Sequence, residues 1–227
     1  MDKKAKIQVI SCGPGLSELR KMHGHSSEWV SSMIRDKISS IDIIKIYNGD
    51  SPIIDKNTSW IIMGSRYSVY DKLNWIKKLE ELIKIGIKNR IFMFGICFGH
   101  QMLCKVLGAK VVNNVNGWEI GSSSIELTRQ GSQSEIFKGF SSPFLAYESH
   151  HDVVLDLPEE LEVLAKNKYG VQSISFSDFI YGVQFHPEFS FDVMKAYYDI
   201  RTRSIDSNDF YVNPQNNGAL VVDNFIR

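Results

Sequence analysis

Cysteine is scarce in this chain, which has only Cys12, Cys97 and Cys104 among its 227 residues. Three cysteines without a regular spacing are too few for a disulfide framework, so we expect reduced thiols in a cytoplasmic protein. Neither charge is in excess, because 26 lysine and arginine residues balance 26 aspartate and glutamate residues. This balance argues against nucleic acid or an anionic membrane surface as a partner.

Long hydrophobic runs are also missing. No stretch approaches the roughly 20 apolar residues of a membrane span, and the apolar run near the N-terminus is too short for a signal peptide. The chain has no linker rich in proline, glycine or serine, and no internal repeat. With 43% hydrophobic residues, it can build one sizeable core, so we expect residues 1–227 to form a single domain.

The first half of the chain alternates short apolar runs with helical patterns, which predicts a parallel sheet flanked by helices. The expected strands cover residues 6–11, 41–47, 59–64 and 90–95, and the expected helices cover residues 26–38, 73–86 and 99–107. Ser26 or Ser27 is the expected N-cap of the first helix. Gly86 is the expected C-cap of the second.

After about residue 110 the pattern changes to short strands separated by turns, and we expect some of them to form a small additional antiparallel sheet. These strand candidates cover residues 110–114, 118–128, 144–149, 161–167, 171–177 and 180–185. Further helical patterns follow near residues 190–203 and 218–227.

Cys97 stands in "FMFGICFGHQ", where a buried strand turns sharply into a helix. The unpaired amides and the dipole at a helix start favour a thiolate there. Gly95 and Gly99 let neighbouring backbone pass closely, so we expect the sulfur to be exposed at the edge of the sheet. The amide of Phe98 would then face a carbonyl attached to the sulfur, as an oxyanion donor. The alternative is a buried structural cysteine, which is how we interpret Cys104.

A nucleophilic cysteine needs a base, and "YGVQFHPEFS" offers one. Residues two apart on a strand face the same way, so His186 and Glu188 are expected to share one face. A relay from Cys97 to His186, oriented by Glu188, suits nucleophilic catalysis. The alternative is a histidine at a strand end that only caps a turn.

These two segments resemble the class I glutamine amidotransferases. "GICFGHQ" fits the Gly-x-Cys-x-Gly-x-Gln turn of that family, and "HPE" fits its His-x-Glu. Residues 63–76, 107–112, 116–121 and 149–158 are similar to a stand-alone branch close to the glutaminase domain of GMP synthetase. The resemblance implies a flavodoxin-like parallel sheet with helices on both sides, in agreement with the pattern above.

The resemblance also implies roles for single residues. Cys97 would be the nucleophile, His186 the general base and acid, and Glu188 the orienting carboxylate. The amides of Phe98 and of Gly64 or Ser65 would form the oxyanion hole.

Gln101 falls at the position that helps to hold the substrate glutamine in this family. Ser149 and His150 would supply main-chain contacts to its α-amino and carboxylate groups. The chain departs from the family pattern at "GSRY", where Arg66 stands near the mouth of the pocket. It departs again at His151, where relatives have glycine.

The expected activity is hydrolysis of the γ-amide of glutamine or of a γ-glutamyl compound, through a thioester on Cys97, with no metal or organic cofactor. Plant γ-glutamyl peptidases resemble this option. One alternative is a glutaminase that delivers ammonia to a separate synthase partner, since the chain has no phosphate-binding P-loop of its own. A non-catalytic binding protein on the same fold and a cysteine peptidase are two more.

A metal site is a further alternative, because His23 and His25 are spaced like chelating residues, and His150 and His151 are adjacent. No Cys-x-x-Cys or His-Glu-x-x-His pattern accompanies them, so we interpret His23 and His25 as loop residues before a helix. The alternative is a position near the mouth of the active site, with a role in substrate specificity. The sequence leaves a homodimer open.

Overall fold

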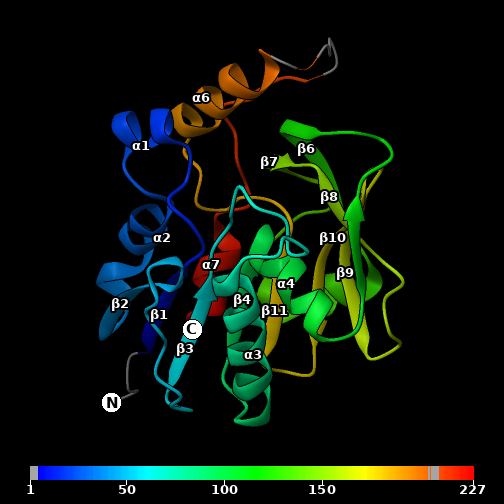
Figure 1. The fold of residues 1–227 in the computed structure, drawn as a ribbon. Coiled ribbons are helices and arrows are strands. Elements are labelled where there is room, and N and C mark those ends of the chain that lie inside the picture. The colour runs from blue at the N-terminus through cyan, green and yellow to red at the C-terminus, as the bar shows by residue number, and fades with distance from the viewer. Residues whose placement is uncertain (1–4, 204, 206–209) are drawn as a thin grey trace.

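A single large sheet runs through the middle of the protein, with helices on both of its faces (Figure 1). The structure, a computed structural model, describes residues 5–203, 205 and 210–227. The sheet has nine strands in the order β2-β1-β3-β4-β11-β10-β9-β6-β7. Its first five strands are parallel to one another, and the remaining neighbours pair antiparallel.

The parallel half contains the strands expected from the first part of the sequence, together with β11. Its strands are β1 (Lys6–Ser11), β2 (Ser40–Lys45), β3 (Thr58–Ile62), β4 (Met93–Ile96) and β11 (Ile180–Val183). Strand β4 begins later than predicted because the preceding helix ends in a turn, in which Arg90 has a φ of 51°.

Most of the later strands extend the main sheet. They are β10 (Gly170–Phe176), β9 (Leu161–Asn167), β6 (Glu119–Leu127) and β7 (Phe144–His150). The predicted small antiparallel sheet is confirmed as a separate pair, formed by β5 (Lys110–Asn113) and β8 (Asp152–Leu155).

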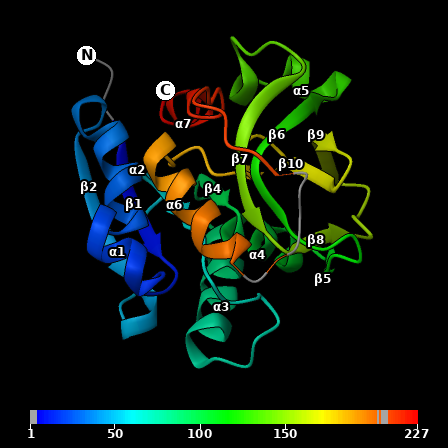
Figure 2. The same ribbon diagram turned by 90° about the horizontal axis from the view of Figure 1, so that it is seen from above.

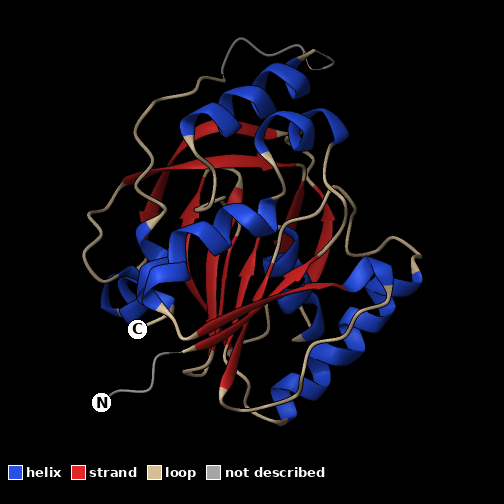
Figure 3. Ribbon diagram, turned by 90° about the vertical axis from the view of Figure 1, so that its left-hand side faces the viewer, coloured by secondary structure: helices blue, strands red, loops and turns tan. Residues whose placement is uncertain are grey.

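Helices α2 (Ser26–Ile34) and α7 (Leu220–Phe225) cover one face of the sheet, and α3 (Asn74–Lys88) and α4 (Phe98–Val106) cover the other (Figure 2). Figure 3 shows the strands between these helical layers. The remaining helices are α1 (Ser17–His23), α5 (Arg129–Gln133) and α6 (Phe191–Thr202), with 3₁₀ turns at Arg35–Lys37, Ile46–Asn48 and Glu135–Phe137. The sequence did not predict α1, α5 or β8.

Alternating side chains of the parallel strands separate two cores. In β3, Ile61 packs with the core under α2 and α7, whereas Trp60 and Ile62 pack with the core under α3 and α4. This alternation follows from the two-residue period of a strand. The inner strands β3 and β4 are buried and largely apolar on both faces, as expected for a parallel sheet covered by helices, whereas the edge strand β2 is largely exposed.

Two predicted helix ends are wrong. The N-cap of α2 is His25 instead of Ser26 or Ser27: its Nδ1 accepts a hydrogen bond from Ser27 N, and its own amide donates to Glu28. Gly86 lies inside α3, which ends at its C-cap Asn89. A side chain at residue 86 would collide with the Met93 and Trp60 side chains beneath the helix, so this glycine serves packing.

None of the helices in the described part of the chain has the length and apolarity that a membrane crossing requires.

Candidate active site

Cys97 lies at the carboxyl end of β4, as the N-cap of α4, with a φ of 52° and a ψ of −103°. A positive φ in a residue other than glycine is strained by roughly 1–3 kcal/mol. The backbone is fixed by a hydrogen bond from Cys97 N to Val183 O at 2.8 Å, across the β4–β11 pair. The side chain is 5% exposed, so the expectation of an exposed sulfur is corrected: the turn places it on the floor of a cleft.

Both glycines beside Cys97 are required by close packing of backbone. A Cβ at Gly99 would collide with the carbonyl of Ile62 on β3, and a Cβ at Gly95 would stand 2.6 Å from the Gly99 carbonyl oxygen. Strand β3, the turn and the first turn of α4 therefore touch without side chains between them.

His186 and Glu188 follow β11 in a turn and do not lie on the strand itself. The prediction of a shared strand face is therefore wrong, because β11 ends at Val183. Their side chains nevertheless meet: His186 Nδ1 lies 2.9 Å from Glu188 Oε1. The turn is held against β7 by a hydrogen bond from His186 N to Tyr147 O at 2.8 Å.

Residues 64, 97 and 186 meet at the carboxyl ends of β3, β4 and β11. A Cβ placed at Gly64 would stand 3.6 Å from Cys97 Cβ and 3.1 Å from His186 Cε1. Burial lowers the pKa of His186, but the charges of Glu188 and Cys97 and hydrogen bonds to both raise it further, to about 10. The imidazole therefore keeps a proton beside the sulfur through the neutral range.

The face of the His186 ring is also packed, and this contact was not predicted from the sequence. Phe189 stacks on it at a centroid distance of 4.0 Å, and Tyr197 of α6 stacks on the other side of Phe189 at 4.7 Å. The only signal in the sequence is the phenylalanine directly after "HPE".

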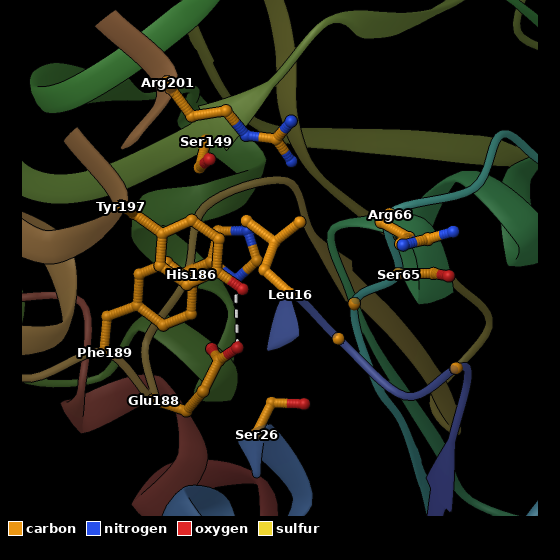
Figure 4. A pocket seen from close by; sticks show the side chains of 13 residues that line it. Leu16, Ser26, Ser65, Arg66, Ser149, His186, Glu188, Phe189, Tyr197 and Arg201 are labelled. Carbon is orange, nitrogen blue, oxygen red and sulfur yellow. Dashed lines mark hydrogen bonds and ion pairs between the residues drawn. The ribbon is translucent and has the colours of Figure 1, made fainter. Parts of the chain in front are cut away.

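Two hollows open beside these residues. The larger holds about 310 Å³, which lies at the lower end of the range for small-molecule sites, and its lining includes Cys97, Gln101, Ser149 and His150. The smaller lies on the side of His186 and is drawn in Figure 4. Its lining includes Gly64, Ser65, Ser149, His186 and Glu188. Phe98 lines neither; its ring packs against Trp75 in the core.

Gln101 reaches the cleft from α4, but its side chain already has protein partners. Its Nε2 donates to Asp152 O at 3.2 Å and to Gln184 Oε1 at 2.9 Å. These two bonds fix the orientation of the Gln101 amide at the lining of the cleft. His151 also lines the cleft and packs edge-on against Trp118 at 5.1 Å.

The side chain of His150 turns away from the cleft into a buried ionic cluster. Its Nε2 lies 2.9 Å from Glu119 Oε2 and 3.3 Å from Glu148 Oε2, and its Nδ1 lies 3.0 Å from Asp152 O. Both ring nitrogens face acceptors only, so both carry protons. Burial lowers the pKa of His150, but the two carboxylates raise it well above its usual value.

Glu119, Glu148 and His150 are also of the types that bind metals. Their ligand atoms lie within 4.8 Å of one another. An imidazolium has no lone pair for a metal, so the present arrangement fits a charge cluster better than a metal site. His25, a weaker candidate in the sequence, is engaged as the N-cap of α2, and its Nε2 lies 3.0 Å from Gly13 O.

The comparisons with known proteins agree with one another. The family model for class-I glutamine amidotransferases matches residues 24–199. Gamma-glutamyl peptidase 4 of Arabidopsis thaliana is 27% identical over 200 residues, which cover 86% of this chain and 80% of the relative. A glutamine-hydrolysing GMP synthase subunit of Methanococcus vannielii is 36% identical over 117 residues, covering 51% of this chain and 60% of the relative.

Solved structures show the same fold. The crystal structure of a glutamine amidotransferase from Thermotoga maritima superposes with a TM-score of 0.72 and 25% identity, covering 98% of this chain and 90% of that one.

Proposed function

The chain belongs to the class-I glutamine amidotransferase family, and from this premise we propose that it hydrolyses the γ-amide of glutamine or of a γ-glutamyl compound. Cys97 is the proposed nucleophile, His186 the general acid and base, and Glu188 the residue that orients the imidazole. One observation carries the proposal: a strained cysteine at a helix start and a carboxylate-bonded histidine both adjoin Gly64 at one cleft.

In the proposed first half-reaction, the Cys97 thiolate attacks the γ-carbonyl carbon, and a carbon–sulfur bond forms while the carbonyl oxygen becomes an oxyanion. The amides of Phe98 and of Gly64 or Ser65 are proposed to donate hydrogen bonds to that oxygen. Loss of one such donor costs ~10²–10³ in rate in other acyl-transfer enzymes. His186 then gives its proton to the departing nitrogen, the carbon–nitrogen bond breaks, and a γ-glutamyl thioester remains.

In the second half-reaction, His186 takes a proton from water as the water attacks the thioester carbon. The carbon–sulfur bond breaks, glutamate leaves and the thiolate returns. The raised pKa of His186 suits this cycle, because the imidazole holds a proton for the leaving amine. The His186–Glu188 hydrogen bond at 2.9 Å would keep the ring in place through both halves.

The substrate contacts proposed at Gln101, Ser149 and His150 fit the cleft to different degrees. All three residues line it. Since the His150 side chain is engaged with Glu119 and Glu148, only its main chain is proposed to contact substrate.

A second candidate is a glutaminase that passes ammonia to a separate synthase. The similarity to the GMP synthase subunit of Methanococcus vannielii favours it. The two candidates share the same chemistry at Cys97 and differ only in what receives the ammonia.

The test is glutamate release from glutamine, glutathione and γ-glutamyl amines by the wild type, Cys97→Ala and Cys104→Ala. We expect turnover in the wild type, none in Cys97→Ala, and near-normal turnover in Cys104→Ala, since Cys104 is buried in the core. A glutamine-like electrophile should add to Cys97, as read by intact mass. A folded protein that neither turns over nor reacts with the electrophile would contradict the proposal. Activity that appears only with a cell extract would favour the second candidate.

A further inference from the structure

Two arginines face the site and are not used in the chemistry above. Arg66 comes from the loop between β3 and α3, and Arg201 comes from α6. Both line the cleft of Cys97 and also the hollow beside His186. Figure 4 shows their side chains reaching the pocket from two different sides.

Each guanidinium is held by an aromatic ring. Arg201 Cζ lies 4.6 Å from the centre of the Trp118 ring, and Arg66 Cζ lies 5.0 Å from the centre of the Tyr67 ring. Stacking occupies the face of a guanidinium and not its edge, where the N–H donors lie. The rings therefore help to orient the two guanidinium groups, and Arg66 Nη2 also donates a hydrogen bond to the Tyr67 hydroxyl at 3.4 Å.

Ser149 adds an unpaired donor between them. It is 8% exposed, lines both hollows, and its hydroxyl has no hydrogen-bond partner within the described part of the protein. A buried hydroxyl without a partner calls for an explanation. Figure 4 places this side chain between Arg201 and His186.

The acidic groups that line the two hollows are already engaged. Asp152 accepts a hydrogen bond from Tyr70 at 2.9 Å, and Glu188 is bonded to His186. Arg66 forms no ion pair with any described residue; its guanidinium contacts Tyr67. The lining thus offers positive charge and a hydroxyl donor to whatever enters.

We propose that Arg201, Ser149 and Arg66 form a carboxylate-binding subsite for the acyl donor. A planar carboxylate matches the fork of a guanidinium, and the hydroxyl of Ser149 supplies a further donor. A γ-glutamyl compound brings its own α-carboxylate, and a γ-glutamyl peptide brings a second carboxylate in the leaving group. The inference rests on the proposed function for the identity of the donor, but not for the binding of a carboxylate.

The experiment measures binding by calorimetry to Cys97→Ala, so that no turnover occurs. The probes are γ-glutamylglycine, its C-terminal amide, and glutamine, at millimolar concentration. In this background we expect Arg201→Gln and Ser149→Ala to weaken the Kd for γ-glutamylglycine roughly 10- to 100-fold, the range of one hydrogen bond to a charged group. Arg66→Gln, at a more exposed position, should weaken it by a smaller factor.

The matched control is Arg203→Gln, two residues along from Arg201, whose guanidinium pairs with Glu18 on the surface. It should leave every Kd unchanged. Arg201→Lys keeps the charge but loses the fork, and should fall between the wild type and Arg201→Gln. Thermal melting of each variant shows whether it is folded. If Arg201→Gln does not fold, Arg66→Gln still tests the subsite.

The pattern across probes identifies the carboxylate. Loss for γ-glutamylglycine but not for its amide or glutamine assigns the subsite to the leaving group. Equal loss for all three probes assigns it to the α-carboxylate. No change beyond twofold in folded variants, or no measurable binding of any probe, overturns the subsite. A wild type that hydrolyses none of the probes, with binding that still depends on Arg201, overturns the proposed function and leaves the subsite standing.

Discussion

The imidazole of His186 lies face to face with the phenyl ring of Phe189, with centroids 4.0 Å apart and 12° between the planes. Phe189 is itself held between this ring and Tyr197, and Trp29 packs edge-on against it at 5.6 Å. His186 is therefore fixed at its edge by Glu188 and on its face by an aromatic stack that joins α2 and α6. A histidine held in two directions loses little orientation during a reaction.

Phe189→Leu should lower kcat about tenfold and change KM less, because misorientation of the proposed catalytic imidazole is costly in rate and Phe189 lines the hollow beside His186 but not the cleft of Cys97. Steady-state kinetics on the best substrate measures it. Phe191→Leu, the same change at a more exposed position on α6, is the control and should match the wild type. A loss of stability with an unchanged kcat would show that Phe189 is only packing.

Glu188→Gln should lower the pKa of His186, because the carboxylate charge is the main influence that raises it to about 10. The imidazole keeps its proton up to that pH in the wild type and should lose it at lower pH in the variant. Titration of ¹⁵N-labelled histidine by NMR, with His186→Asn for assignment, gives both midpoints. Equal midpoints would assign the shift to Cys97 instead.

Glu148→Gln should change how stability depends on pH. Burial, with the charge of Glu119, raises the pKa of Glu148 to about 7. The folded state therefore binds a proton that the unfolded state releases near 4.5, so wild-type stability falls between these values as the pH rises. Glu148→Gln has no carboxyl group at this position, so its stability should not fall in this way as the pH rises.

The melting temperature of Glu148→Gln should be close to the wild-type value at pH 5 and a few degrees above it at pH 8. About 1 kcal/mol corresponds to roughly 2–4 °C at this chain length. Glu126→Gln, at an exposed position of β6, should show no such trend. A difference that is constant with pH would contradict the assignment.

Cys97→Gly should be more stable than Cys97→Ala by about 1 kcal/mol, because glycine relieves the positive φ and alanine does not. The same pair of substitutions at Cys104, inside α4, should have the opposite order, since glycine in a helix costs roughly 0.5–1 kcal/mol relative to alanine. Urea unfolding of the four variants measures both differences. The same order at both positions would argue against strain at Cys97.

The family and the fold were predictable because they depend on local patterns. The alternation of apolar runs and helical segments predicted the parallel strands β1 to β4, and "GICFGHQ" with "HPE" identified the family. The roles of Cys97, His186 and Glu188 stay predictions, as do the single domain and the cytoplasmic location.

What the sequence could not give depends on packing between distant elements. The Phe189–Tyr197 stack and the approach of Arg201 require α6 to dock over the turn after β11. The cluster of Glu119, Glu148 and His150 requires the register that places Glu119 opposite His150. Gly86 was misread because its need for space comes from Trp60 and Met93 beneath it.

The place of β11 between β4 and β10 has a consequence for the newly made chain. Cys97 leaves the ribosome before β5 to β10 are made, whereas His186 follows only after these strands have been synthesised. Because β11 must insert into the sheet before the two groups can meet, a half-made molecule carries an unaided cysteine. If the proposed mechanism holds, activity appears in one late step, and its recovery in a refolding experiment would time the insertion of β11.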